Sequence, residues 1–330
     1  MRILVNYIWI PSLLIAFGNT ALSQSTNNEK HSFRMSWDND FLNFRGDGTD
    51  RYYTNGIRFD YFYTKQKKAK FPSSLLLNIS QENDNIYGWG LAQFMFTPKN
   101  IDLTEIQYND RPYAGALYSI HSLESTDTTK KIRITTEIFL GVIGPISFAD
   151  EAQTWAHRVI GYTKPRGWPN QVSNDIILNY NISLERQMVH YPNKISVSGI
   201  VETFSGTLYN AAGAGFMLRA GKCNTQFQDL QLQKNKSGNR YQLYVFMKPV
   251  IRAVLSNSLL QGGLISQLSD NQVGYTLSKD QIERVVVLYD VGLVYARPKW
   301  SILISQKFRT AEFEGQYTQE FGNITVWYKL

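Results

Sequence analysis

The chain has 330 residues, a formal net charge of +7 and a high aromatic content of 20 Tyr, 18 Phe and 7 Trp. Its single cysteine, Cys223, excludes an intramolecular disulfide and disfavours a zinc site built on cysteines. The positive balance suits anionic surfaces such as phosphorylated lipid headgroups, although ordinary solvated Lys and Arg side chains explain it equally well.

The N-terminus has the pattern of a secretory signal. An arginine precedes the apolar stretch 3–17, and Ala21-Leu22-Ser23 places small side chains at alternate positions, which suits cleavage before Gln24. The alternative is a membrane anchor, but polar residues and a proline interrupt a run already shorter than the roughly 20 apolar residues of a spanning helix. We therefore expect a signal peptide over 1–23 and a mature domain over 24–330.

Alternation with period two dominates the remaining chain, and no other segment is long and uncharged enough for a spanning helix. Apolar side chains alternate over 57–63 and 132–142, as they do in strands that are apolar on one side. Further candidate strands are 32–41, 85–97, 111–124, 175–190, 194–205, 210–221, 240–256, 259–268, 282–297, 299–310 and 317–330. A single-chain barrel normally closes with an even number of strands, so one of these thirteen is wrong or one is missing. The weakest is 259–268, which contains Gly262-Gly263.

The sequence therefore predicts an all-β fold, a transmembrane antiparallel barrel in the outer membrane of a Gram-negative bacterium. The alternating segment 324–330 resembles the terminal strand that the outer-membrane insertion machinery recognises, although a final Phe is more usual than Leu330. With the first strand starting at the periplasm, the long connections 98–110 and 145–174 lie outside. By its length, 222–239 is also expected outside. A nucleic-acid partner is not expected.

Four polar motifs fall where strands of this barrel would turn. They are Trp37-Asp38-Asn39-Asp40, the segment 50–56, the segment 110–115 and Ala156-His157-Arg158. Counting strand directions from the periplasm places all four at the outer rim. This convergence predicts that they form one site.

A short α-helix is expected over 150–160, within the connection 145–174. Acidic residues begin the segment and Gly161 ends it. Its apolar residues share one face and His157 lies beside that stripe, so we expect the helix to lie against the barrel rim and to present its imidazole. A lone histidine is more often structural than catalytic. However, a neutral imidazole can take a proton from water, and nearby carboxylate and amide oxygens can bind calcium.

Several segments resemble the outer-membrane lipid A 3′-O-deacylase family: 37–56, 88–115 and 141–175, including Gly141-Val142-Ile143-Gly144-Pro145 and Gly167-Trp168-Pro169-Asn170-Gln171. The resemblance implies a twelve-stranded barrel whose site lies between the wall and a helix from an outer loop. It also implies an esterase that removes a 3′-O-linked acyloxyacyl group from lipid A, the lipid part of lipopolysaccharide. In that family Ca²⁺ polarises the ester carbonyl and a histidine activates water. By motif, Asn39 and Asp40 belong to the cation and oxyanion region, Thr54 to the substrate pocket, and His157 is the base.

Each of these residues also has a structural interpretation. Asn39 and Asp40 are good turn formers, and Thr54 is a good strand residue. Arg51, Arg111 and Arg158 suit lipid phosphate by their guanidinium geometry, or they pair with nearby carboxylates.

The function also has alternatives at this point. They are an outer-membrane phospholipase and a non-enzymatic pore or surface-binding barrel. A nucleophile elbow of the Gly-x-Ser-x-Gly kind is lacking from the sequence, which favours activated water over an acyl-enzyme.

Overall fold

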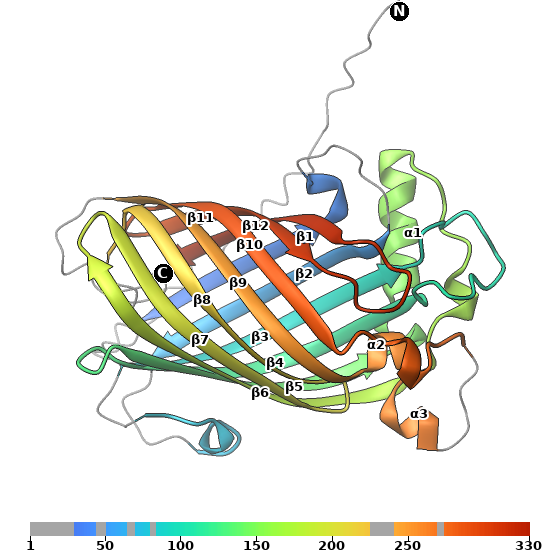
Figure 1. Cartoon of the computed structure of the whole chain (residues 1–330), viewed down its shortest axis with the longest axis horizontal. Coiled ribbons are helices and arrows are strands. Elements are labelled where there is room, and N and C mark those ends of the chain that lie inside the picture. The colour runs from blue at the N-terminus through green and yellow to red at the C-terminus, as the bar shows by residue number, and fades with distance from the viewer. Residues whose placement is uncertain (1–29, 44–50, 65–69, 80–83, 225–240, 269–273) are drawn as a thin grey trace, which may run out of the picture.

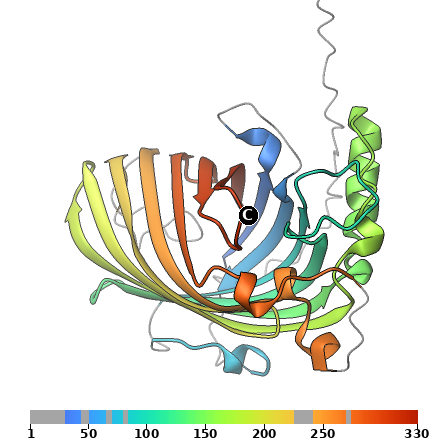
Figure 2. The ribbon, with the colours of Figure 1, turned by 45° about the vertical axis from the view of Figure 1, so that its right-hand side comes forward.

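The structure is a computed structural model that describes residues 30–43, 51–64, 70–79, 84–224, 241–268 and 274–330. The predicted signal peptide and its cleavage site lie outside the described residues. Within them, twelve strands form one closed antiparallel barrel, in which each strand pairs with its sequence neighbours and β1 closes against β12 (Figures 1 and 2). This confirms the predicted fold class and the even number of strands.

The strands differ in length and are tilted around the barrel (Figure 1). Their bounds are β1 His31–Asn39, β2 Tyr52–Thr64, β3 Asp84–Thr97, β4 Ala114–Asp127, β5 Ile132–Ile143, β6 Asp175–Tyr191, β7 Ile195–Gly206, β8 Tyr209–Lys222, β9 Gln242–Asn257, β10 Val285–Ala296, β11 Trp300–Arg309 and β12 Gln319–Lys329. The helices are α1 Ala149–Ile160, α2 Ser258–Gln261 and α3 Leu264–Leu268, with short 3₁₀ turns η1 Asp40–Leu42, η2 Ser73–Leu75, η3 Pro145–Ser147, η4 Trp168–Asn170 and η5 Lys279–Gln281.

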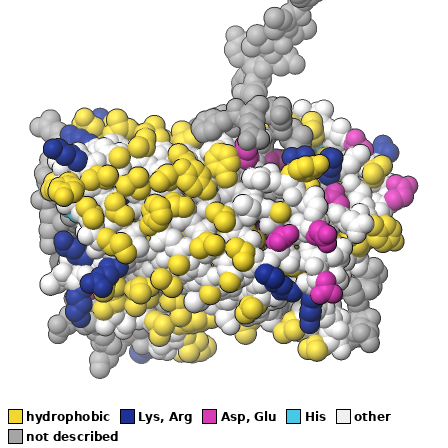
Figure 3. Space-filling view, in the orientation of Figure 1, with side chains coloured by type: hydrophobic (Ala, Val, Ile, Leu, Met, Phe, Trp, Pro, Cys, Tyr) yellow, Lys and Arg dark blue, Asp and Glu magenta, His cyan; other side chains and the backbone are white. Residues whose placement is uncertain are grey.

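Ion pairs between strands that are not neighbours identify the face that lines the lumen. Arg58 of β2 pairs with Glu137 of β5 at 2.7 Å, and Lys307 of β11 pairs with Asp38 of β1 at 3.0 Å. Alternation then directs residues such as Phe59 outward, and hydrophobic side chains cover the outer wall between charged ends (Figure 3). Among the described helices, none is long and apolar enough to span a membrane.

The two ends of the barrel carry different connections. The first strand begins and the last strand ends at one end, here called the terminal end. The opposite end, here called the loop end, carries α1, α2 and α3 (Figure 1). The connections 98–110 and 145–174 lie at the loop end as predicted. Most of 222–239 lies outside the described residues, but β8 ends and β9 begins at the terminal end, opposite to the end expected for this connection.

The candidate strand 259–268 is not a strand. Asn257 ends β9, and its side chain accepts a hydrogen bond from the backbone N–H of Leu259 at 3.1 Å, which begins α2. Gly262 then takes a left-handed φ of 78°. A Cβ on Gly263 would lie 2.2 Å from the Asp175 side chain, so this glycine lets the turn pack closely. The local capping and glycine chemistry thus overrides the apolar pattern.

Candidate active site

The predicted helix in the fifth connection is present as α1, outside the wall at the loop end (Figures 1 and 2). Asp150 and Glu151 occupy its first turn, where the helix dipole favours acids, and Gly161 ends it with a left-handed φ of 70°. The helix packs against β3 and β4. Sequence signals for the helix ends were therefore sufficient to predict this element.

The buried face of α1 carries polar side chains, and its apolar stripe is exposed. Trp155, Val159 and Ile160 are 63%, 62% and 72% exposed, while Gln153 and His157 are 2% and 5% exposed. The helix therefore lies against the wall with its His157 side buried, while the apolar stripe is turned outward. An apolar face can turn outward around a membrane barrel, because lipid rather than water surrounds the wall.

The start of α1 approaches the wall at a glycine. A Cβ on Gly115 of β4 would lie 2.1 Å from Ser147 Oγ and 2.4 Å from the Ala149 side chain. Ala149 also belongs to a buried cluster with Met95 of β3 and Trp168. Gly115 therefore permits the close contact that fixes the base of the helix.

His157 is held by its own connection. Its Nδ1 lies within hydrogen-bonding distance of the Thr163 carbonyl oxygen, and its ring meets the Tyr162 ring edge-on with centroids 5.1 Å apart. A carbonyl oxygen only accepts, so Nδ1 must carry the hydrogen. In the neutral ring, Nε2 is then the nitrogen that can take a proton.

Gln153 lies one helical turn before His157 on the same buried face. Its Oε1 accepts a hydrogen bond from the indole N–H of Trp168 at 2.7 Å, which fixes the amide orientation. Its Nε2 is buried without a hydrogen-bond partner among the described residues. Sequence reasoning missed Gln153. The signal that could have found it is the i, i+4 spacing with His157.

Asn39 and Thr54 come together on the outward side of the wall. Asp38 faces the lumen, so alternation turns Asn39 outward. Its Nδ2 donates to the Thr54 carbonyl oxygen at 3.4 Å, and its Oδ1 accepts from the backbone N–H of Phe41. Thr54 sits at a bulge in β2, and its hydroxyl contacts that of Thr97 at 2.8 Å. Asn39 thus combines its turn-forming role with a contact to the second motif.

The strand register links this pair to the helix. Asn39 lies opposite Asn55, Asn55 opposite Met95, and Met95 opposite Gly115, which forms one row across β1 to β4. Three strand spacings make this row about 14 Å wide. From Ala149 to His157, α1 rises about 12 Å, and it runs across the strand direction (Figure 1). The length of the helix is therefore similar to the width of the row that ends at Asn39, and its contacts with the wall are to β3 and β4.

Asp40 is 5% exposed and connects the first motif to the second, because its Oδ2 accepts a hydrogen bond from the backbone N–H of Arg51 at 3.1 Å.

The three candidate arginines do not lie together. Arg51 stacks near the rings of Tyr52 and Tyr317, Arg158 is exposed on α1, and Arg111 points into the lumen.

A cation at this site would depend on oxygen donors of mixed kinds. The described residues contain no group of three or more His, Cys, Asp or Glu side chains arranged to hold a metal. Calcium also accepts amide and backbone oxygens. Asn39, Asp40 and the Thr54 carbonyl supply that donor type within one neighbourhood. The donor chemistry fits a hard cation held through few carboxylates.

A protein-family model described as "Outer membrane protein LpxR" matches residues 9–330. Among solved structures, LpxR from Salmonella typhimurium aligns with a TM-score of 0.71 at 20% identity, over 90% of this chain and 99% of that chain. The β domain of the Bordetella autotransporter BrkA aligns with a TM-score of 0.41 at 7% identity, over 92% and 99% of the two chains. Curated protein sequences give no match.

Proposed function

The chain belongs to the LpxR family of outer-membrane proteins, and we propose that it is an esterase that removes a 3′-O-linked acyloxyacyl group from lipid A. The observation that carries this proposal is the buried polar face of α1. Gln153 and His157 face inward at the loop end, while Trp155, Val159 and Ile160 are turned outward. A reactive face beside an apolar one suits an ester whose acyl chains lie in the membrane.

His157 is the proposed general base. The Thr163 carbonyl oxygen selects the tautomer with hydrogen on Nδ1, which leaves Nε2 to take a proton from the attacking water. The same nitrogen then returns the proton to the leaving sugar oxygen. Hydrolysis through activated water needs no covalent acyl-enzyme.

Gln153 is the proposed donor to the oxygen that becomes negative as water attacks. Its amide is oriented by Trp168, so its unpaired N–H groups are positioned before the substrate binds. A preorganised donor stabilises the developing charge without reorganisation during the reaction.

Asn39 and Asp40 are the proposed holders of Ca²⁺, which when bound would polarise the ester carbonyl. Thr54 contacts Asn39 through its carbonyl oxygen, and it is the proposed residue of the substrate pocket. Arg51 and Arg158 are the better placed candidates for lipid phosphate, since Arg111 is turned into the lumen.

Mass spectrometry of lipid A, with the protein reconstituted in vesicles, tests this function. We expect loss of the 3′-O-linked acyloxyacyl group with calcium, abolition by a chelator and recovery when calcium is added back. Full turnover in excess chelator would exclude the cation. Release of lysophospholipids with unchanged lipid A would instead indicate a phospholipase. Ion conductance without any lipid cleavage would indicate a pore.

A further inference from the structure

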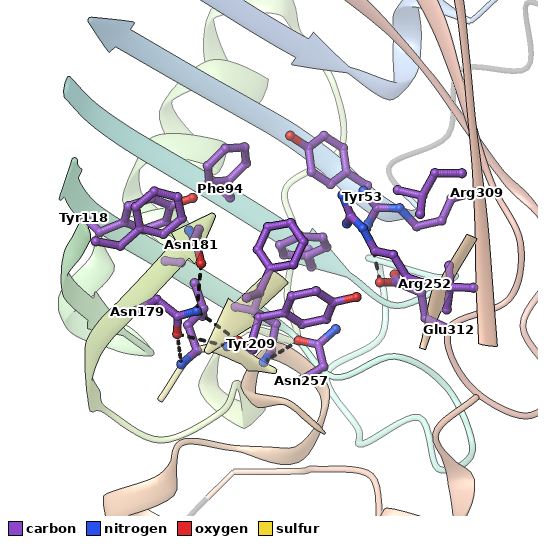
Figure 4. A pocket seen from close by; sticks show the side chains of 18 of the residues that line it. Tyr53, Phe94, Tyr118, Asn179, Asn181, Tyr209, Arg252, Asn257, Arg309 and Glu312 are labelled. Carbon is purple, nitrogen blue, oxygen red and sulfur yellow. Dashed lines mark hydrogen bonds and ion pairs between the residues drawn. The ribbon is translucent and has the colours of Figure 1, made fainter. Parts of the chain in front are cut away.

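A second feature of the loop end lies inside the barrel. The lumen contains a cavity of about 200 Å³, larger than the roughly 150 Å³ that admits benzene in an engineered protein core. Figure 4 shows it from close by. Much of its lining is apolar or aromatic, from several strands and α2: Tyr53, Phe94, Phe96, Tyr118, Phe204 and Leu259.

One side of the cavity is charged. Glu312 in the β11–β12 connection pairs with Arg111 at 2.7 Å and with Arg309 at 3.4 Å (Figure 4). Although burial acts to raise it, the two guanidinium charges hold the pKa of the Glu312 carboxyl below its ordinary value. One carboxylate is therefore shared by two guanidinium groups, and this cluster carries an excess positive charge.

Several hydrogen-bond donors of this cluster are unused. The Arg111 side chain is fully buried and stacks on the Phe96 ring at 4.1 Å. Its Nε and Nη2, and the Nε of Arg309, have no hydrogen-bond partner among the described residues. A buried charge is costly unless it is paired and hydrogen-bonded. Arg111 and Arg309 both line the cavity, so an anion bound there would offset their excess charge.

The lining narrows the chemistry of that anion. Guanidinium forks match both carboxylate and phosphate oxygens. A hydrated inorganic anion, however, would gain nothing from the aromatic wall formed by Phe94, Phe96 and Phe204. An anion with an apolar tail uses both the charged side and the aromatic side.

We propose that this luminal cavity binds an amphiphilic monocarboxylate, with its carboxylate on Arg111 and Arg309 and its tail against the aromatic wall. The site is separate from the outward face on which ester hydrolysis is proposed and does not depend on it. Free fatty acids have this chemistry, and they could come from the protein's own hydrolysis or from the surrounding membrane.

Titration calorimetry on the whole protein in amphipol tests the site with three probes: octanoate, octan-1-ol and inorganic phosphate. We expect saturable binding of one octanoate and binding of the other two weaker by about tenfold or more, because each lacks one half of the interaction. Equal binding of octan-1-ol or of phosphate, or no saturable octanoate binding, overturns the proposal.

Two variants locate the site. Arg309→Gln removes the excess charge, and Leu259→Trp fills the cavity while the guanidinium groups remain. Each should weaken octanoate binding about tenfold or more. The control is Arg186→Gln, which removes an exposed arginine of β6 with the same change in charge and should leave binding unchanged. Retention of the heat-modifiable gel shift shows that each variant is folded. Unchanged binding in both folded variants overturns the assignment.

The source of the ligand is distinguished by extracting the purified protein with organic solvent. A carboxylic acid that copurifies with the parental protein and is absent from His157→Ala indicates the hydrolysis product. The same acid in both proteins indicates a membrane source, and either result supports the site. Absence of any acid, together with no octanoate binding, overturns it.

Discussion

His121 and His157 are both buried, and each lies where a connection folds back on the outer wall. His121 is in the wall under such a connection, and His157 is in the connection itself. His121 lies within β4, where its Nε2 contacts Ser73 Oγ at 2.9 Å and its Nδ1 contacts the Gly88 carbonyl oxygen at 3.0 Å. Its ring also stacks on Trp89 with centroids 4.1 Å apart. His157 instead sits on a helix, beside a glutamine whose amide nitrogen lacks a partner among the described residues.

The comparison separates two uses of one residue type. Both ring nitrogens of His121 have fixed partners from two different segments, so its imidazole joins the 70–79 segment to the wall. That segment also buries Leu76 against Tyr87 and Leu123. In His157, the partner on Nδ1 selects the tautomer that makes Nε2 basic. His157 differs from His121 in its place on a helix at the loop end, one turn after Gln153 on the same buried face. Burial alone therefore does not identify a catalytic histidine.

The largest expected effect is on His157→Ala. Loss of a general base should reduce lipid A deacylation by about 10²–10⁴-fold, measured by mass spectrometry of lipid A. The barrel should still fold, because a connecting helix contributes little to strand closure. His190→Ala, near the terminal end of β6, is the control and should retain the parental rate. Parental activity in folded His157→Ala would refute the base.

Gln153→Glu sharpens the role of the second polar residue on α1. Glutamate keeps an acceptor for Trp168 but removes the amide donor, so kcat should fall by about 10²–10³-fold with little change in KM. Steady-state kinetics on lipid A vesicles measure both constants. A change confined to KM would contradict the proposed oxyanion contact.

Gly115→Val tests whether the position of α1 on the wall matters. The added side chain must displace Ser147 or Ala149, and misplacement of a catalytic group by about 1 Å can cost about 10²-fold in rate. Gly161→Asn is the matched control, because a Cβ there meets nothing within 4 Å and asparagine tolerates a left-handed φ. Equal rates in the two variants would show that the glycine contact does not position the helix.

His121→Ala should have the smallest effect on rate and a measurable effect on stability. It removes the contacts of His121 with Ser73 and with the Gly88 carbonyl oxygen, and loss of a buried hydrogen bond typically costs about 1–3 kcal/mol. The free energy of unfolding, from urea titration in vesicles, should fall while the rate per folded molecule stays parental. A large loss of rate at unchanged stability would reverse the roles assigned to the two histidines.

The strand pattern and the positions of the four motifs were predictable, because both follow from local alternation and from counting turns in a closed antiparallel sheet. The bounds of α1 were also predictable from local signals, because acidic residues begin the helix and Gly161 ends it. The same reasoning brought Asn39 and Thr54 to one end before their contact was visible. The thirteenth strand failed because the pattern of 259–268 does not reveal the cap at Asn257 or the packing of Gly263 on Asp175.

The sequence by itself determined the barrel, the end at which the motifs gather and the helix that carries His157. Only the tertiary structure decided which face of that helix is buried. The apolar stripe of α1 can contact either protein or the surrounding lipid, so its sequence does not say which of the two it meets. It also decided that Arg111 turns into the lumen, toward Glu312, 201 residues away in the chain. Contacts at that separation depend on barrel closure, which no local pattern encodes.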